Sequence, residues 1–225
     1  MLWSVLSPLI TLLVMSIVFS GFFLENQPHY ITYLFCGNIL FSYFSDSTSG
    51  GMESLLDNSS IFTKINVPKH LFLFSRNVSS LINFGLTFII FLVFCIIDGV
   101  TFTWAFLLLF IPIVCMVIFN LGVGLILSAL YVFFRDMKYL WNIFTMLLMY
   151  MSAIFYTVDI LPENLQLLLH LNPMYVYIKY FRSLVIYGAM PSLEINVLCV
   201  AYAAIAILIG GIVYKKNNHK FLYYV

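Results

Sequence analysis

The stretch FTWAFLLLFIPIVCMVIFNLGVGLILSALYVFF, residues 102–134, decides the fold class. It contains no charged residue and is longer than the roughly 20 apolar residues that a helix needs to cross a bilayer. Over all 225 residues, 63% are hydrophobic and 8% charged, whereas a soluble domain carries about 25% charged residues. The mean hydropathy is +1.05. Too little polar surface is left to cover a water-soluble globule of this size, so most of the chain is predicted to lie in lipid.

The other apolar runs are also long and unbroken, whereas strands of a membrane barrel would be short and alternating. We therefore predict an all-α integral membrane protein that forms one membrane domain over residues 1–225. Six spans are expected, at 2–24, 30–44, 78–97, 102–134, 139–158 and 193–214. The fourth is longer than a straight crossing, and Pro112 could kink it. Gly122, Gly124 and Ser128 give it a small-residue face for close helix packing.

Lysine and arginine fix the predicted orientation. With six spans, eight basic residues fall on one side of the membrane and only Lys179 and Arg182 on the other. The positive-inside rule makes the first side cytoplasmic. Both termini are then cytoplasmic in a multi-pass protein of the cytoplasmic (inner) membrane. The eight residues are Lys64, Lys69, Arg76, Arg135, Lys138, Lys215, Lys216 and Lys220.

The longer cytoplasmic connection, DNSSIFTKINVPKHLFLFSR, occupies residues 57–76. Asn58 or Ser59 is a candidate N-cap for a short turn of helix that Pro68 ends. That helix would expose apolar side chains between lysines, which is typical of a docking element. The alternative is a plain cytoplasmic loop. The predicted contact residues are Ile61, Phe62, Lys64, Ile65 and Lys69.

On the outer side, residues 159–192 are apolar but divided by Pro162, the Asn172–Pro173 pair and Gly188. Each piece is too short to span, so we expect short helices that lie in the interface or re-enter the membrane. The proline at 173 predicts a turn between two of these helices.

Sites for catalysis are missing from the sequence pattern. The acids lie at span ends or in connections, the four histidines share no motif, and no phosphate-binding loop, nucleophile elbow or metal-ligand spacing occurs. The four cysteines are isolated in or beside apolar runs, and a net charge of +1 gives no nucleic-acid footprint. We predict no catalytic residue, no metal and no cofactor. If the protein transports against a gradient, another chain must supply the energy.

Five stretches in order along nearly the whole chain resemble the membrane subunit of ABC type-2 exporters of the O-antigen, capsule and teichoic acid group. They are LWSVLSPLITLLVMSIVFS (2–20), LLDNSSIFTKINVPKHLFLFSR (55–76), LYVFFRDMKYLW (130–141), MSAIFYTVDILPE (151–163) and LNPMYVYIKYFRSLVIYG (171–188). Two departures stand out. The sequence starts at the Trp motif, so we expect the family's amphipathic interface helix before the first span to be missing. Ser152–Ala153 replace the family's Thr-Pro pair.

The resemblance implies a permease rather than an enzyme. Two copies would pair with two ATP-binding subunits, which bind the ATP. A lipid-linked polysaccharide would cross the lipid bilayer between the two permease copies. Residues 57–76 would be the coupling segment, and Phe155 and Tyr156 would line the exit. Arg135 could meet the carrier-lipid diphosphate, because a guanidinium offers paired donors to phosphate oxygens.

Three alternatives stay open at this point. The first is an ABC type-2 exporter of a small hydrophobic compound, since the sequence does not measure cargo. The second is a membrane-embedded glycan-modifying enzyme. Asp159 and Glu163 are four residues apart, but Pro162 between them argues against a shared helical face. The third is a stand-alone channel, which the lack of polar residues in a regular pore pattern disfavours.

Overall fold

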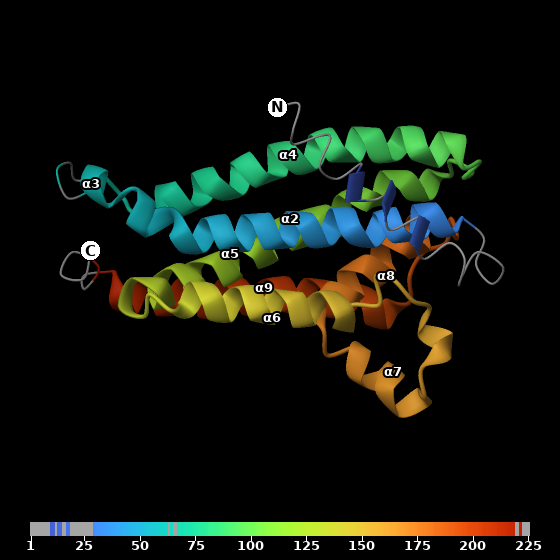
Figure 1. Ribbon diagram of the computed structural model, residues 1–225. Helices are drawn as coiled ribbons and strands as arrows, with labels where there is room; N and C mark the ends of the chain where they lie inside the picture. The colour runs from blue at the N-terminus through green and yellow to red at the C-terminus, as the bar shows by residue number, and fades with distance from the viewer. Residues whose placement is uncertain are drawn as a thin grey trace. The chain divides into compact units, whose positions relative to one another are not determined.

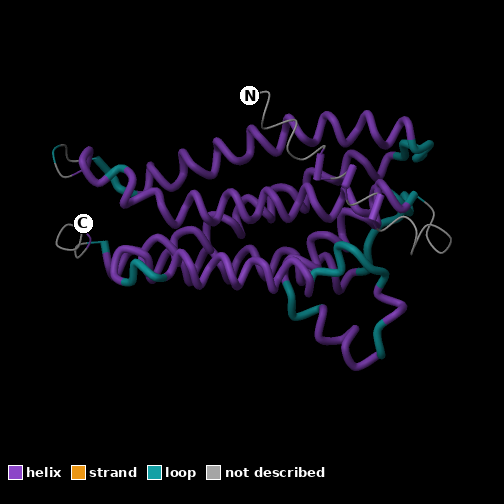
Figure 2. The backbone as a smooth tube through the Cα atoms, viewed as in Figure 1, coloured by secondary structure: helices purple, strands orange, loops and turns teal. Residues whose placement is uncertain are grey.

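The computed structural model describes residues 10, 11, 13, 14, 17, 18, 29–62, 64, 67–218 and 221, without the side chains of residues 62, 163 and 167. Most of the predicted first span, 2–24, and Ile65 of the coupling segment lie outside the described residues. The part that is described is helical, with loops and no strand (Figure 2). This agrees with the predicted all-α class.

The elements follow one another along the chain as coloured in Figure 1. They are α2 (Tyr30–Asp57), α3 (Ser59–Phe62), α4 (His70–Ile97), η1 (Trp104–Leu109), α5 (Phe110–Phe133), α6 (Met137–Met151), η2 (Val158–Ile160), α7 (Glu163–Leu169), α8 (Pro173–Val185) and α9 (Leu193–Asn217).

Among the described residues, three helical segments are long and apolar enough to cross a membrane: His70–Ile97, Trp104–Phe133 and Leu193–Asn217. They correspond to the predicted third, fourth and sixth spans. The helix of the third span begins at His70, eight residues before the predicted start at 78, so the polar residues between them are helical. Pro112 lies in the first turn of α5, just after the 3-10 segment, where a missing N–H does not break the helix.

Helix α2 is longer than predicted, since it continues past residue 44 to Asp57. Its polar residues did not end it because their side chains bond locally. The Thr48 hydroxyl donates to the Phe44 carbonyl over 2.7 Å, and the Ser54 hydroxyl donates to the Gly51 carbonyl over 2.7 Å. Ser47 accepts from the buried amide of Asn77 on α4 over 2.8 Å. Such bonds let polar side chains lie inside a helix packing without unpaired groups.

Helix α6 is shorter than the predicted fifth span, 139–158, because it ends at Met151. At about 1.5 Å per residue it falls short of a hydrocarbon core of roughly 30 Å. The chain then leaves the helix at Ser152 and Ala153, and Ala153 has φ +50° in the left-handed region. The bend that the family's Thr-Pro pair suggested is thus present here without a proline.

The segment from 159 to 192 contains the short helices that the sequence predicted. Helices α7 and α8 are separated at Asn172, whose side chain accepts from the Met174 N–H over 2.9 Å and caps α8. The next turn is at Gly188, with φ +59°.

By its internal contacts the chain divides into two compact units, and the long helices contribute residues to both. The first unit contains Met1–Ser42, Asn83–Ile113 and Leu147–Cys199. Its interior is aromatic: the Phe35 ring meets the rings of Phe91 and Phe94 edge-on at 5.4 and 5.6 Å, and Phe181 of α8 lies 5.8 Å from Phe91. Helix α8 also packs against η1.

The second unit contains Tyr43–Ile82, Val114–Met146 and Val200–Val225. One part of its core joins Leu55, Ala129, Val132, Tyr214 and Phe221.

The glycines of α5 have packing roles within the second unit, as the small-residue face predicted. A Cβ on Gly122 would overlap the backbone of Ala206, and one on Gly210 would overlap the carbonyl of Gly122. Helices α5 and α9 therefore cross in direct backbone contact. Gly124 lies against Gly51 of α2 with more room, since a Cβ on Gly124 would be in ordinary van der Waals contact, 3.7 Å from the Gly51 Cα.

Candidate functional site

The predicted coupling segment, residues 57–76, is divided into the end of α2, the single turn α3 and the first two turns of α4 (Figure 1). The short helix is confirmed over Ser59–Phe62, so it contains Ile61 and Phe62. The Ile61 side chain is 42% exposed and Lys64 is exposed. An apolar and a basic side chain are thus presented to the surroundings by one short loop.

Polar contacts within the second unit hold this segment in place. Asp57 pairs with Arg76 over 3.0 Å, which joins the end of α2 to the start of α4. Lys69 donates to the carbonyl of Asn218, just after α9, over 2.9 Å, and partial burial lowers its pKa. Lys69 thus has one partner within the chain, and its contact with an ATP-binding subunit stays a prediction.

A second ion pair joins α6 to α2 in the same unit, where Lys138 lies 2.7 Å from Glu53. This contact raises the pKa of Lys138 through the hydrogen bond to Glu53. Arg135 and Asp136 are exposed in the three-residue connection between α5 and α6. The Asp136 carbonyl accepts from the Tyr139 N–H over 3.0 Å, which starts α6.

Phe155 and Tyr156, the predicted exit residues, follow the end of α6. Phe155 is buried, at 7% exposure, with its ring 5.9 Å from Tyr150. Tyr156 is partly exposed, and its hydroxyl donates to the Tyr150 carbonyl over 3.0 Å. The two neighbours thus face different surroundings.

The sequence missed the most concentrated polar cluster of the first unit, which surrounds Arg182 of α8. Arg182 is only 5% exposed. It donates to the carbonyls of Ala153 and Ile154 over 2.8 and 2.9 Å, and to the Tyr33 carbonyl through two nitrogens over 3.2 and 3.1 Å. Burial lowers its pKa from the ordinary value. The four bonds satisfy both the charge and the carbonyls.

Two tyrosines of α2 complete this arrangement. The Tyr30 hydroxyl donates to the Phe155 carbonyl and the Tyr33 hydroxyl to the Tyr156 carbonyl, each over 2.9 Å. Together with Arg182 they bind all four carbonyls of residues 153–156. Non-helical backbone that is buried away from water needs such partners, because its carbonyls would otherwise stay unpaired. We call residues 153–156 and these three donors the arginine-held turn.

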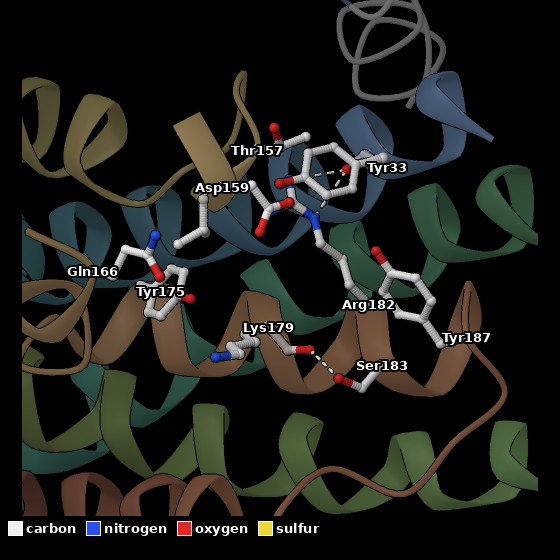
Figure 3. Close-up of a pocket in the computed structure, with 10 residues that line it drawn as sticks. Tyr33, Thr157, Asp159, Gln166, Tyr175, Lys179, Arg182, Ser183 and Tyr187 are labelled. Atoms are coloured by element: carbon white, nitrogen blue, oxygen red, sulfur yellow. Dashed lines mark hydrogen bonds between the residues drawn. The ribbon is translucent and has the colours of Figure 1, made fainter. Parts of the chain in front are cut away.

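Beside the arginine-held turn lies a pocket of ≈ 260 Å³ (Figure 3). Figure 3 shows side chains from α2, α7 and α8 and from the chain after the turn converging on it. Because Asp159 and Tyr187 are exposed, the pocket opens to the surface. Its lining residues are Tyr33, Thr157, Val158, Asp159, Gln166, Tyr175, Lys179, Arg182, Ser183 and Tyr187.

A weak signal for Arg182 existed in the sequence. It is a lone guanidinium in a helix of apolar and aromatic residues, PMYVYIKYFRSLV, and such a charge is either solvated or needs buried partners. Its three acceptor carbonyls come from segments far away in sequence. The pattern alone could not identify them, and the residue entered the sequence argument only as a charge on the outer side.

The three helical segments that are long and apolar enough to cross a membrane define a helical integral membrane protein. Comparison with known proteins then gives the family: residues 1–186 match the ABC-2 type transporter family, and the chain belongs to it. The chain is also similar to the O-antigen export system permease protein RfbA of Klebsiella pneumoniae, at 27% identity over 98% of this chain and 85% of that protein. A protein of the same name from Myxococcus xanthus is 24% identical over the same shares.

Membership of this family makes the chain a transport subunit. None of the described residues forms a cluster of histidine, cysteine and carboxylate side chains that could hold a metal ion.

Proposed function

We propose that this chain is the permease subunit of an ATP-driven exporter that moves a lipid-linked polysaccharide of the O-antigen class across the cytoplasmic membrane. The observation that carries the proposal is the extent of the likeness. Relatives named as O-antigen export permeases align with 98% of the chain, including the coupling segment and the arginine-held turn.

In this proposal the chain has six spans, and both termini are cytoplasmic. The ion pairs Asp57–Arg76 and Glu53–Lys138 support the charge argument, because they gather basic residues from separate connections in one unit. Residues 159–192 would then lie outside.

The active assembly is two copies of the chain with two ATP-binding subunits. The ATP-binding subunits dock on residues 57–64, where Ile61 is exposed and only Asn58 separates α3 from α2. A push on α3 would be transmitted to α2 through this short connection. Arg135, exposed in the middle of the α5–α6 connection, would meet the diphosphate of the carrier lipid.

The second copy would pack on the predicted first and fifth spans. The exposed apolar side of α6, which includes Leu140, Ile143 and Phe144, supports this. The glycine face of α5 is not available for dimer contact, because it is used within the chain. Cysteine crosslinking along α6 in native membranes checks the dimer, and no crosslink at any scanned position would contradict it.

The proposed function is tested by deleting the gene in its host and restoring it on a plasmid. We expect deleted cells to lose surface polysaccharide and to accumulate the lipid-linked form inside, and the plasmid to reverse both. A permease with a disabled partner ATPase should behave like the deletion. Normal surface polysaccharide in the deleted strain would overturn the proposal, and accumulation of a small hydrophobic compound instead would indicate a different cargo.

A further inference from the structure

The pocket beside the arginine-held turn contains several polar groups whose hydrogen-bonding capacity is unused. The Asp159 carboxylate and the hydroxyls of Tyr175 and Tyr187 make no hydrogen bond to any residue that the structure describes. Gln166 uses its amide N–H, which donates to the Leu161 carbonyl over 2.8 Å, and keeps its side-chain oxygen available. These groups line one small cavity of ≈ 260 Å³ (Figure 3).

Arg182 is not available to a ligand as an anion receptor. Its guanidinium already donates to three backbone carbonyls and lies over the Tyr33 ring at 3.3 Å from the centroid. Lys179 is also engaged, with its ammonium 3.4 Å from His170 Nε2, and the other nitrogen of His170 is 3.1 Å from Glu194. The pocket therefore offers the exposed Asp159 carboxylate, whereas Arg182 and Lys179 are already bonded to other groups. A phosphate would meet a negative charge and no available cation, so the pocket disfavours it.

The aromatic side chains divide by availability. One face of the Tyr33 ring is covered by Arg182, and Lys179 lies 5.5 Å from the Tyr175 ring centroid. Tyr187 is 58% exposed at the pocket mouth. Its ring is a free apolar face beside acceptors and donors. Burial raises the pKa of Tyr175 to about 12, so its hydroxyl remains a donor at neutral pH.

We propose that this pocket is a binding site for a single neutral sugar ring, held by stacking on Tyr187 and by hydrogen bonds to the Asp159 carboxylate, the Tyr175 hydroxyl and the Gln166 amide oxygen. A sugar ring presents adjacent hydroxyls on its edge and C–H groups on its faces. A carboxylate can accept from two such hydroxyls at once, and an aromatic ring packs against the C–H face. The assignment rests on the proposed function, in which this pocket faces the outside and meets the polymer after it crosses.

Its place in the chain would make the pocket a holding point. Thr157, Val158 and Asp159 follow directly on the arginine-held turn, and Tyr175, Lys179 and Ser183 share one side of α8. A sugar in the pocket would therefore contact the segment that follows α6 and also the helices α7 and α8. Occupancy would hold the emerging polymer on the outer side between power strokes.

The test uses saturation-transfer NMR on the complete permease–ATPase complex in lipid nanodiscs, a method that detects weak binding. The probes are the methyl glycosides of glucose, mannose, galactose and N-acetylglucosamine at millimolar concentration, with inorganic phosphate as the anionic probe. The variants Asp159→Asn and Tyr187→Ala change exposed side chains, so both should fold. Asp136→Asn and Tyr139→Ala are matched controls, because both residues are exposed and outside the pocket.

We expect at least one glycoside to bind the wild type, the two pocket variants to bind it about tenfold more weakly, and the controls to bind it normally. Equal binding by all five proteins would overturn the proposal. So would the absence of saturation transfer to every glycoside, or displacement of the glycoside by phosphate.

The outcome is separable from that of the proposed function. Cells that export polysaccharide through a permease without sugar binding at the pocket would disprove this site and leave the exporter intact. If cells that lack the gene export polysaccharide normally, the proposed exporter function is wrong, whatever the NMR result.

Discussion

The guanidinium of Arg182 stacks on the ring of Tyr33 at 3.3 Å from the centroid and also donates to the Tyr33 backbone carbonyl. One residue of α2 thus binds the buried charge of α8 in two ways. Arg182→Lys keeps the charge but loses the planar fork that reaches three carbonyls. We expect it to lower the free energy of unfolding in detergent by on the order of 3 kcal/mol, measured by thermal unfolding.

Arg135→Lys is the matched control for this change, because Arg135 is exposed. It should unfold at the wild-type temperature while its export rate reports on phosphate contact. Equal stability of Arg182→Lys and wild type would mean that the buried bonds contribute little and that the arginine-held turn is held by the tyrosines.

The crossing of α5 and α9 makes a second prediction. Gly210→Ala places a Cβ against the carbonyl of Gly122, so the helices must separate. We expect a loss of about 1–3 kcal/mol in the free energy of unfolding from overpacking. Gly211→Ala is the adjacent control, since a Cβ there meets nothing within 4 Å. It should be neutral or slightly stabilising, because alanine favours helix.

If Gly210→Ala and Gly211→Ala unfold at the same temperature, the close crossing in the second unit is not a determinant of stability. The comparison cancels effects of helix propensity, since both changes are the same substitution in one helix.

Asn172 joins two elements of the first unit. Its side-chain oxygen caps α8, and its amide nitrogen donates to the Met151 carbonyl and the Ser152 hydroxyl over 3.1 and 3.0 Å. Asn172→Asp keeps the cap and loses both donations. We expect it to be less stable than wild type by about 1–3 kcal/mol. Wild-type thermal stability in this variant would indicate that only the cap matters.

The coupling segment gives a prediction about the partner. Phe62→Ala combined with Ile65→Ala should leave membrane insertion intact but reduce co-purification of the ATP-binding subunit and stop export, because each fully buried anchor contributes about 1.5–3 kcal/mol. A charge change at Lys64 alone should be milder, since exposed pairs contribute about 0–1 kcal/mol.

A matched control for the coupling change is Ile82→Ala combined with Ile89→Ala, two exposed apolar residues of α4 outside residues 57–76. The measurement is ATPase recovery from detergent, normalised to permease. Full recovery with normal export in the coupling variant would mean that the partner docks elsewhere.

The two predicted exit residues need separate tests. Phe155 is buried, so Phe155→Ala should destabilise the fold by about 3–5 kcal/mol and lower the protein level. Tyr156→Ala removes a partly exposed ring and should reduce export while leaving protein level and ATP hydrolysis near normal. Tyr156→Phe keeps the ring and loses the bond to Tyr150. Normal export by Tyr156→Ala would end the exit-lining role.

The sequence by itself predicted that most of the chain lies in lipid and that it is helical. It also predicted three of the spans, the glycine face of α5 and the helix boundary at Asn172–Pro173. These features are local. A backbone in lipid must bond within its own segment, so hydropathy alone implies a helix. A proline or a glycine acts on the backbone conformation of its immediate neighbours.

Only the tertiary structure decided where α2 and α6 end, that Phe155 is buried whereas Tyr156 is not, and which groups Arg182 binds. Each of these depends on partners from distant segments. Asn77 and Ser47 pair across two helices, so the polar stretches that suggested loops are helical. Arg182 meets carbonyls of residues 153, 154 and 33 only after α2, α6 and α8 have packed. A buried charge is stable only with such partners, and a linear pattern does not contain them.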